Sequence, residues 1–341
     1  MKATLDGTDR MLQLVMNLPD QIAAGAMSAR AARVGRAGRF DAVAVAGMGG
    51  SGIGARIVQG LLFDRSALPV HVCNDYGIPA AVTAKALFVA VSYSGNTEET
   101  LSAYAQARRR GCRIIAITSG GELGRSAARA GYPVISIPVG MPPRAALGYL
   151  FSTLLVSAER LGVCESHRRG LGEAVRLMRA RRRSWLVRAR TMAKHINGRL
   201  TLVYSTGRML DAVADRWRTQ FNENAGVMCH TSYFPEHNHN EIMGMGQPKH
   251  PGRNTVVIAL LDRETHARTR YRLESVLDIN AETYHLAMRL ESEGRSRLAR
   301  ILSLVMLGDL VSVELARLNG KDAMEVGRID ELKRRMAQKR G

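Results

Sequence analysis

The sequence alternates short β-branched apolar runs with segments that have the spacing of amphipathic helices, and this alternation constrains the fold more than any other feature. In the first half, glycine, serine or proline bounds each apolar run. Strands that alternate with helices pair in parallel, so this half is predicted to be a doubly wound parallel sheet. Strands are predicted at 40–47, 69–74, 86–92, 112–119 and 133–138, with helices at 11–24, 52–63, 97–110 and 123–130.

The same pattern restarts after a long stretch, 144–197, that is predicted to be helical with breaks near Gly162 and Gly170. The fold class is therefore predicted to be α/β, with two doubly wound subdomains that each contain a parallel sheet flanked by helices. We place their boundary after residue 155, giving subdomains 1–155 and 156–341, and expect a ligand between them. The second set of strands is predicted at 199–206, 254–261 and 283–292, with helices at 209–224, 296–318 and 329–339.

Charge and composition limit the classes of partner. The net charge of +19 favours polyanions, but only 5% of the residues are aromatic, so stacking platforms are not expected and no specific nucleic acid is predicted. No apolar run is long enough to cross a membrane, and the first residues lack the layout of a signal peptide. The four cysteines form no CxxC pair. A cytoplasmic protein with reduced thiols is expected.

The motif GMGGSGIG follows the first predicted strand and opens a helix. Glycine lets the backbone approach a ligand, and a helix N-terminus attracts anions, so Gly49, Gly50 and Ser51 are candidate substrate-binding residues. The motif also contains the dinucleotide spacing GxGxxG, beginning at Gly47, for which Asp75 is the candidate acidic partner. A turn that needs glycine only for packing is the structural alternative.

The motif VSYSGNTEET ends another predicted strand, and it carries more hydroxyl groups than a helix cap needs. Ser92, Ser94 and Thr97 lie beside Gly95 at the start of a helix. Neutral donors, backbone amides and a helix dipole together suit a phosphate group, whereas capping would use a single hydroxyl. We predict that these three residues bind phosphate.

A third stretch, 221–246, is dense in carboxylate, amide and imidazole groups. It contains FNENAG and, further along, HNHNEIMG. His237, His239 and Glu241 occupy alternate positions, and imidazole and carboxylate groups bind zinc or manganese readily. An acid–base site and a metal site are therefore both open for this stretch.

These motifs resemble those of a known family. SYSGNTEET is similar to the phosphate-binding signature of sugar isomerase (SIS) domains. GMGGSGIG, SYSGNTEET, PRAALGYLF, QFNENAG and HNHNEIMG occur in the order seen in bifunctional phosphoglucose/phosphomannose isomerases, and the resemblance covers about residues 40–335. It implies two SIS subdomains, a cytoplasmic homodimer without metal or cofactor, and interconversion of glucose 6-phosphate, and of mannose 6-phosphate, with fructose 6-phosphate.

The resemblance also implies a role for each catalytic residue. Glu223 matches the base that moves a proton between C1 and C2 through a cis-enediol. His239 matches a ring-opening residue contributed by the neighbouring subunit, and Arg144 matches an arginine that stabilises the enediolate oxygens. Lys333 matches a C-terminal lysine that assists ring opening, with Lys321 as the second choice.

A non-catalytic function is the alternative that the motifs leave open. An SIS module that senses a sugar phosphate would need the phosphate-binding loop but no acid–base pair. Three further polar residues, His237, Asp309 and Glu314, are interpreted as structural.

Overall fold

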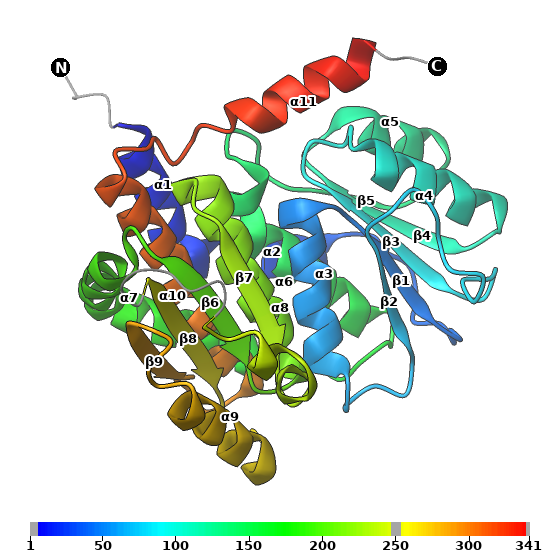
Figure 1. The fold of residues 1–341 in the computed structure, drawn as a ribbon. Coiled ribbons are helices and arrows are strands. Elements are labelled where there is room, and N and C mark those ends of the chain that lie inside the picture. The colour runs from blue at the N-terminus through cyan, green and yellow to red at the C-terminus, as the bar shows by residue number, and fades with distance from the viewer. Residues whose placement is uncertain (1–5, 247–253, 339–341) are drawn as a thin grey trace.

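The computed structural model describes residues 6–246 and 254–338, and it contains two parallel sheets flanked by helices (Figure 1). The strand orders are β2-β1-β3-β4-β5 and β7-β6-β8-β9. This arrangement confirms the predicted α/β class. The strands are β1 (Val43–Ala46), β2 (Val70–Cys73), β3 (Leu87–Ser92), β4 (Arg113–Thr118) and β5 (Val134–Ser136) in the first sheet, and β6 (Leu200–Ser205), β7 (Cys229–Tyr233), β8 (Thr255–Leu261) and β9 (Leu286–Glu291) in the second.

The helices cover both faces of each sheet. Helices α4 and α5 cover one face of the first sheet, α9 covers one face of the second, and α3 and α8 lie side by side between the sheets (Figure 1). No helix among the described residues is long and apolar enough to cross a membrane. The helices are α1 (Gly7–Met16), α2 (Leu18–Ala31), α3 (Gly49–Leu62), α4 (Glu98–Arg109), α5 (Gly121–Arg129), α6 (Leu147–Arg160), α7 (Arg168–Ile196), α8 (Arg208–Gln220), α9 (Ala267–Ile279), α10 (Arg297–Leu318) and α11 (Gly327–Gln338).

One hydrophobic core joins the two halves. It runs from the inner faces of β1, β3 and β4 through α2, α3 and α6 to α7, α8 and α10. Helix α10 is buried along almost its whole length, so charged residues on it have no access to water unless they reach a helix end. Smaller clusters lie beneath α4 and α5 and beneath α9. The continuous core holds the ends of α8 and α10 firmly against the first half.

Several predicted boundaries differ from the structure. The predicted break at Gly170 is wrong, because α7 runs through it and the glycine lets the helix approach Leu298 at the start of α10. Strand β7 was not predicted, because CHTSY at the sheet edge has no apolar alternation. Helix α9 was also not predicted, since it buries only a short apolar stripe. The boundary after residue 155 falls inside α6 and stays a prediction.

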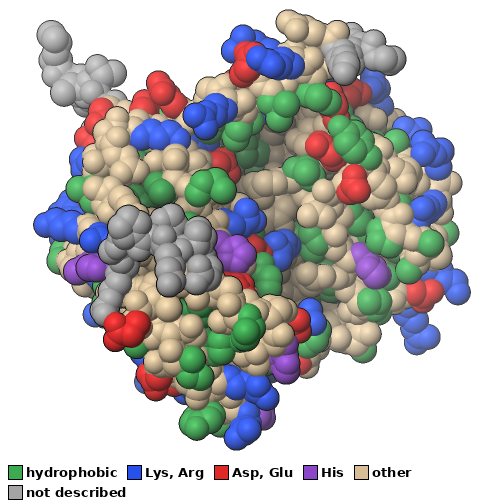
Figure 2. Space-filling model, in the orientation of Figure 1, with side chains coloured by type: hydrophobic (Ala, Val, Ile, Leu, Met, Phe, Trp, Pro, Cys, Tyr) green, Lys and Arg blue, Asp and Glu red, His purple; other side chains and the backbone are tan. Residues whose placement is uncertain are grey.

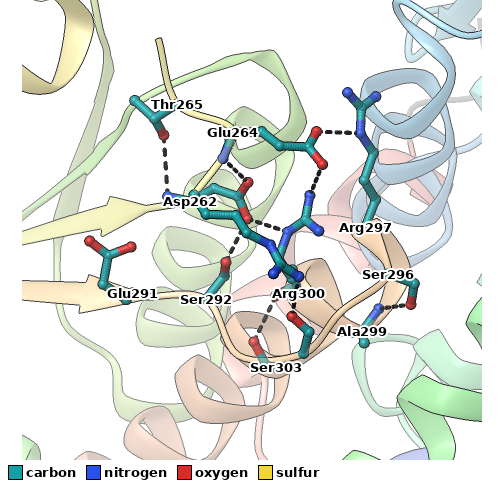
Figure 3. Close-up of polar contacts among 12 residues, drawn as sticks. Asp262, Glu264, Thr265, Glu291, Ser292, Ser296, Arg297, Ala299, Arg300 and Ser303 are labelled. Carbon is teal, nitrogen blue, oxygen red and sulfur yellow. Dashed lines mark hydrogen bonds and ion pairs between the residues drawn. The ribbon is translucent and has the colours of Figure 1, made fainter. Parts of the chain in front are cut away.

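The carboxyl ends of the two sheets differ in chemistry. In the first sheet they carry the glycine-rich and serine-rich motifs. In the second, Asp262 follows β8 and accepts hydrogen bonds from the backbone of Glu264 and from Arg300, which also pairs with Glu264 (Figure 3). Asp262 and Arg300 are each only 2% exposed. Charged side chains of the chain itself therefore pair with one another at the end of β8.

Candidate active site

Glu223 lies in a π-helical turn that extends α8. The turn spans Phe221–Ala225 and ends at Gly226, whose φ of 68° is in the left-handed region. Single π turns in helices are frequent at functional sites. Here the turn buries Phe221 and Asn224 completely, while the Glu223 side chain keeps 26% of its surface exposed. The carboxylate is therefore fixed by a buried backbone and remains accessible to a ligand.

Arg144 reaches Glu223 from the other half of the chain. It lies in the 3-10 turn Pro143–Ala146, is 3% exposed, and places Nη1 3.5 Å from Glu223 Oε2. Its Nε donates to Asn224 Oδ1 at 2.7 Å and its Nη2 donates to the Ala323 carbonyl at 2.6 Å. Burial lowers the pKa of Arg144, and the nearby Glu223 carboxylate opposes that change. The two residues that the motifs assign to proton transfer and charge stabilisation are thus neighbours.

The glycine-rich motif lies against Arg144. A Cβ atom on Gly50 would be 2.8 Å from the Arg144 backbone nitrogen, so glycine is required here for the approach of α3 to the arginine turn. Gly49 has φ of 48° and open space around it. Ser51 Oγ accepts a hydrogen bond from the Tyr93 N–H at 3.2 Å, which ties this motif to the serine-rich loop. Packing therefore explains Gly50, and substrate binding by Gly49, Gly50 and Ser51 stays a prediction.

The three predicted phosphate-binding hydroxyls differ in their contacts. Ser92 is 1% exposed, accepts from the Gly95 N–H and contacts Thr97 Oγ1 at 3.0 Å, so it shapes the loop. Ser94 is exposed, and Thr97 is half-buried at the N-terminus of α4, where its side chain makes no capping hydrogen bond. Ser94 and Thr97 are consequently the hydroxyls available to a ligand, while Ser92 supports them.

The loop conformation depends on Gly95. Its φ is 70°, and a Cβ atom there would be 1.9 Å from the Gly120 carbonyl oxygen. Asn96 adds a second anchor, because its side-chain oxygen accepts from the Glu122 N–H at the start of α5. Asp75, the acidic residue considered for a dinucleotide, is exposed and accepts from the neighbouring Tyr76 N–H.

The structure distinguishes the two candidate lysines. Lys321 follows α10, and its Nζ lies 3.3 Å from the Glu223 carbonyl oxygen. Burial lowers the pKa of Lys321, and the positive charge of Arg144 lowers it further. Lys333, the first choice from the motif, is on α11 with 73% of its side chain exposed and pairs with Asp330. The second choice, and not the first, is therefore beside Glu223 within this chain.

The two histidines of HNHNE have different environments. His237 is 1% exposed, stacks on Phe234 with ring centroids 4.5 Å apart, and contacts Tyr204. His239 is exposed on the same short turn and, among the described residues, makes no hydrogen bond or ion pair with Glu223. No group of three or more histidine, cysteine, aspartate or glutamate side chains in the described part of the chain is arranged to hold a metal ion.

The space-filling view is hollowed between the two halves, and basic, acidic and histidine side chains gather at this hollow (Figure 2).

Asn224 was not predicted from the sequence to contact Arg144. Its place in the NEN triplet was the available signal, but only the fold shows that the amide is buried and turned toward the arginine.

Comparison with known proteins gives the family. Residues 41–157 match the SIS domain, and residues 187–336 match the bacterial phospho-glucose isomerase C-terminal SIS domain. A bifunctional phosphoglucose/phosphomannose isomerase of Caldicellulosiruptor bescii is 38% identical over 336 residues, covering 96% of this chain and 99% of that protein. The one from Thermoplasma acidophilum is 37% identical over 300 residues, covering 88% and 91%.

The fold comparison agrees. A hypothetical protein from Thermus thermophilus superposes with a TM-score of 0.75 at 16% identity, covering 97% of this chain and 90% of that one. At this identity the likeness concerns the fold alone. The sequence relatives extend over nearly the whole chain, and both SIS units are present in order. The chain belongs to the family of bifunctional phosphoglucose/phosphomannose isomerases.

Proposed function

We propose that this protein is an aldose–ketose isomerase that interconverts glucose 6-phosphate, and also mannose 6-phosphate, with fructose 6-phosphate. The observation that carries the proposal is the contact between the partly exposed Glu223 carboxylate and the buried Arg144 guanidinium. A sensor of sugar phosphates needs a phosphate-binding loop but has no use for this pair, so the pair favours the isomerase. The names of the relatives support the same substrates.

The reaction requires a base that takes a proton from one carbon and returns it to the next. Glu223 removes the C2 proton of the open-chain aldose, the electron pair forms the C1–C2 double bond, and negative charge develops on the carbonyl oxygen at C1. The same carboxyl group then protonates C1, and the hydroxyl proton at O2 moves to O1 to leave the ketone. Arg144 stabilises the enediolate oxygens, and Ser94 and Thr97 hold the phosphate.

The direct test is Glu223→Gln. The amide is nearly isosteric but cannot accept the proton, so kcat should fall by about 10²–10⁴-fold while the KM for fructose 6-phosphate changes little. Glu331→Gln on exposed α11 is the matched control and should keep the wild-type rate. A Glu223→Gln enzyme with the wild-type rate would place the base elsewhere.

The ring must open before proton transfer, and we assign this step to His239 from a neighbouring subunit together with Lys321. The exposed position of His239 supports a role across a homodimer interface. Cytoplasmic location and a homodimer are part of this proposal.

The test of the shared site mixes Glu223→Gln with His239→Ala subunits under conditions that allow the subunits to exchange. About half of the dimers are then mixed, each with one intact site, so about a quarter of the wild-type activity should return. No recovery after proven exchange would mean that both residues serve one chain.

A further inference from the structure

Three arginines lie buried in the described part of the chain, but their charges are balanced differently. Arg216 forms a bidentate pair with Asp309, with distances of 2.8 and 2.7 Å. Arg300 pairs with Asp262 at 2.7 Å. Arg144 instead donates to a neutral amide and a neutral carbonyl. Among the described residues its ion-pair partner is the proposed base itself, and Asp322 acts on its charge from farther away. Arg144 is thus the buried arginine whose partners leave its charge available.

The orientation of the neutral amide is fixed by a chain of hydrogen bonds from α10. The Ser312 hydroxyl donates to the Asp309 carbonyl at 2.7 Å. Because a hydroxyl has one proton, Ser312 Oγ then accepts from Asn224 Nδ2 at 2.9 Å. The amide oxygen of Asn224 must therefore face Arg144 Nε, where it accepts at 2.7 Å.

We propose that Asn224 is a positioning residue that holds Arg144 with a neutral acceptor and so preserves its positive charge for the enediolate. This inference rests on the proposed function. When Glu223 takes the carbon-bound proton it becomes neutral, and the negative charge moves to the substrate oxygens. Arg144 can stabilise the negative charge, first on Glu223 and then on the substrate oxygens, only if no other carboxylate is already paired with its guanidinium. An aspartate at 224 would have the same reach and a permanent charge.

The decisive variant is Asn224→Asp. Its second oxygen would face Ser312, whose hydroxyl can rotate away from the Asp309 carbonyl to donate to it, so we expect the variant to fold. We expect kcat to fall by about 10- to 100-fold with the KM for fructose 6-phosphate within about threefold. Affinity for an aldonohydroxamic acid phosphate, an anionic mimic of the enediolate, should fall by a similar factor, whereas the affinity for inorganic phosphate should stay unchanged.

The comparison variant is Asn222→Asp, which adds the same charge one residue before Glu223 in the same turn. The amide nitrogen of Asn222 faces the carbonyls of Val227 and Arg218, and not Arg144. A smaller loss of hydroxamate affinity in this control supports the inference. An equal loss in both variants would overturn the inference, because the added charge alone would then explain the effect. Wild-type kcat and hydroxamate affinity in Asn224→Asp would also overturn it.

A second variant keeps the inference testable if Asn224→Asp does not fold. Ser312→Ala removes the acceptor that holds the Asn224 amide nitrogen, without adding charge, so Asn224 should hold Arg144 less firmly, and kcat and hydroxamate affinity should fall while phosphate binding is kept. Unchanged values would overturn the inference. A wild-type enzyme without turnover on any hexose 6-phosphate would contradict the proposed function instead, and the ratio of hydroxamate to phosphate affinity would still test the role of Asn224.

Discussion

Replacing Asp309 with asparagine should show how much stability is lost when Arg216 is left as an unpaired buried charge beneath the site. Asp309 and Arg216 have side chains that are 3% and 2% exposed, and Arg216 also donates to the Arg144 carbonyl at 3.0 Å. Asp309→Asn keeps the shape of the side chain and removes its charge. Arg216 is then left buried without a counter-charge, in contact with the backbone that carries Arg144.

The expected magnitude follows from burial. Removing one partner of a buried pair typically costs about 3–5 kcal/mol, which is about two to three and a half orders of magnitude in the folding constant. Asp64→Asn is the matched control, because Asp64 pairs with Arg297 but is 54% exposed, and Arg297 keeps Glu264 as a second partner. An exposed pair contributes about 0–1 kcal/mol.

Urea unfolding at one protein concentration measures both changes. Trp185 and Trp217 are buried at 2% and 0% exposure, so their fluorescence should report loss of the core. The unfolding midpoint of Asp309→Asn should move far below that of the wild type, while Asp64→Asn should move slightly. Equal shifts would refute the reasoning, because burial would then not determine the cost of the missing charge.

Three further predictions concern the site. Lys321→Met should lower kcat for fructose 6-phosphate at least about tenfold, because Lys321 is beside Glu223. Lys333→Met should keep the rate, because Lys333 faces solvent. The opposite order in steady-state kinetics would indicate that Lys333, and not Lys321, assists the reaction. Gly95→Ala should raise the KM for the sugar phosphate much more than it changes kcat, since the new Cβ atom would lie 1.9 Å from the Gly120 carbonyl oxygen and distort the loop. An unchanged KM would show that this loop does not bind the phosphate. Burial lowers the pKa of His237 below its ordinary value of 6.5, so the neutral ring is favoured in the folded state. The unfolded chain then binds a proton on this ring more readily than the folded protein, and stability falls as the pH falls through 6.5 and below. His237→Phe should flatten the fall in melting temperature between about pH 7.5 and 5, and an equally steep fall would contradict this origin.

Much of the fold follows from local pattern. The strands of both sheets except β7 were predicted, because a buried parallel strand must be continuously apolar and must end where the chain turns. Parallel strands bring their carboxyl ends to one edge of a sheet, so the motifs after the neighbouring strands β1 and β3 lie close together. Ser51 and Tyr93 are indeed joined by a hydrogen bond there. The resemblance of the motifs then supplied the family.

Tertiary structure decided which of several similar residues meet. Sequence spacing does not distinguish Ser92 from Ser94, and only the loop conformation turns the first inward and leaves the second exposed. Lys321 lies beside Glu223, while Lys333 extends on an exposed helix. The Arg144–Asn224 contact joins segments from the two halves, since the core formed with α10 holds the end of α8 against the arginine turn. Local periodicity fixes what each segment becomes, but close packing of distant segments determines which polar atoms come within bonding distance.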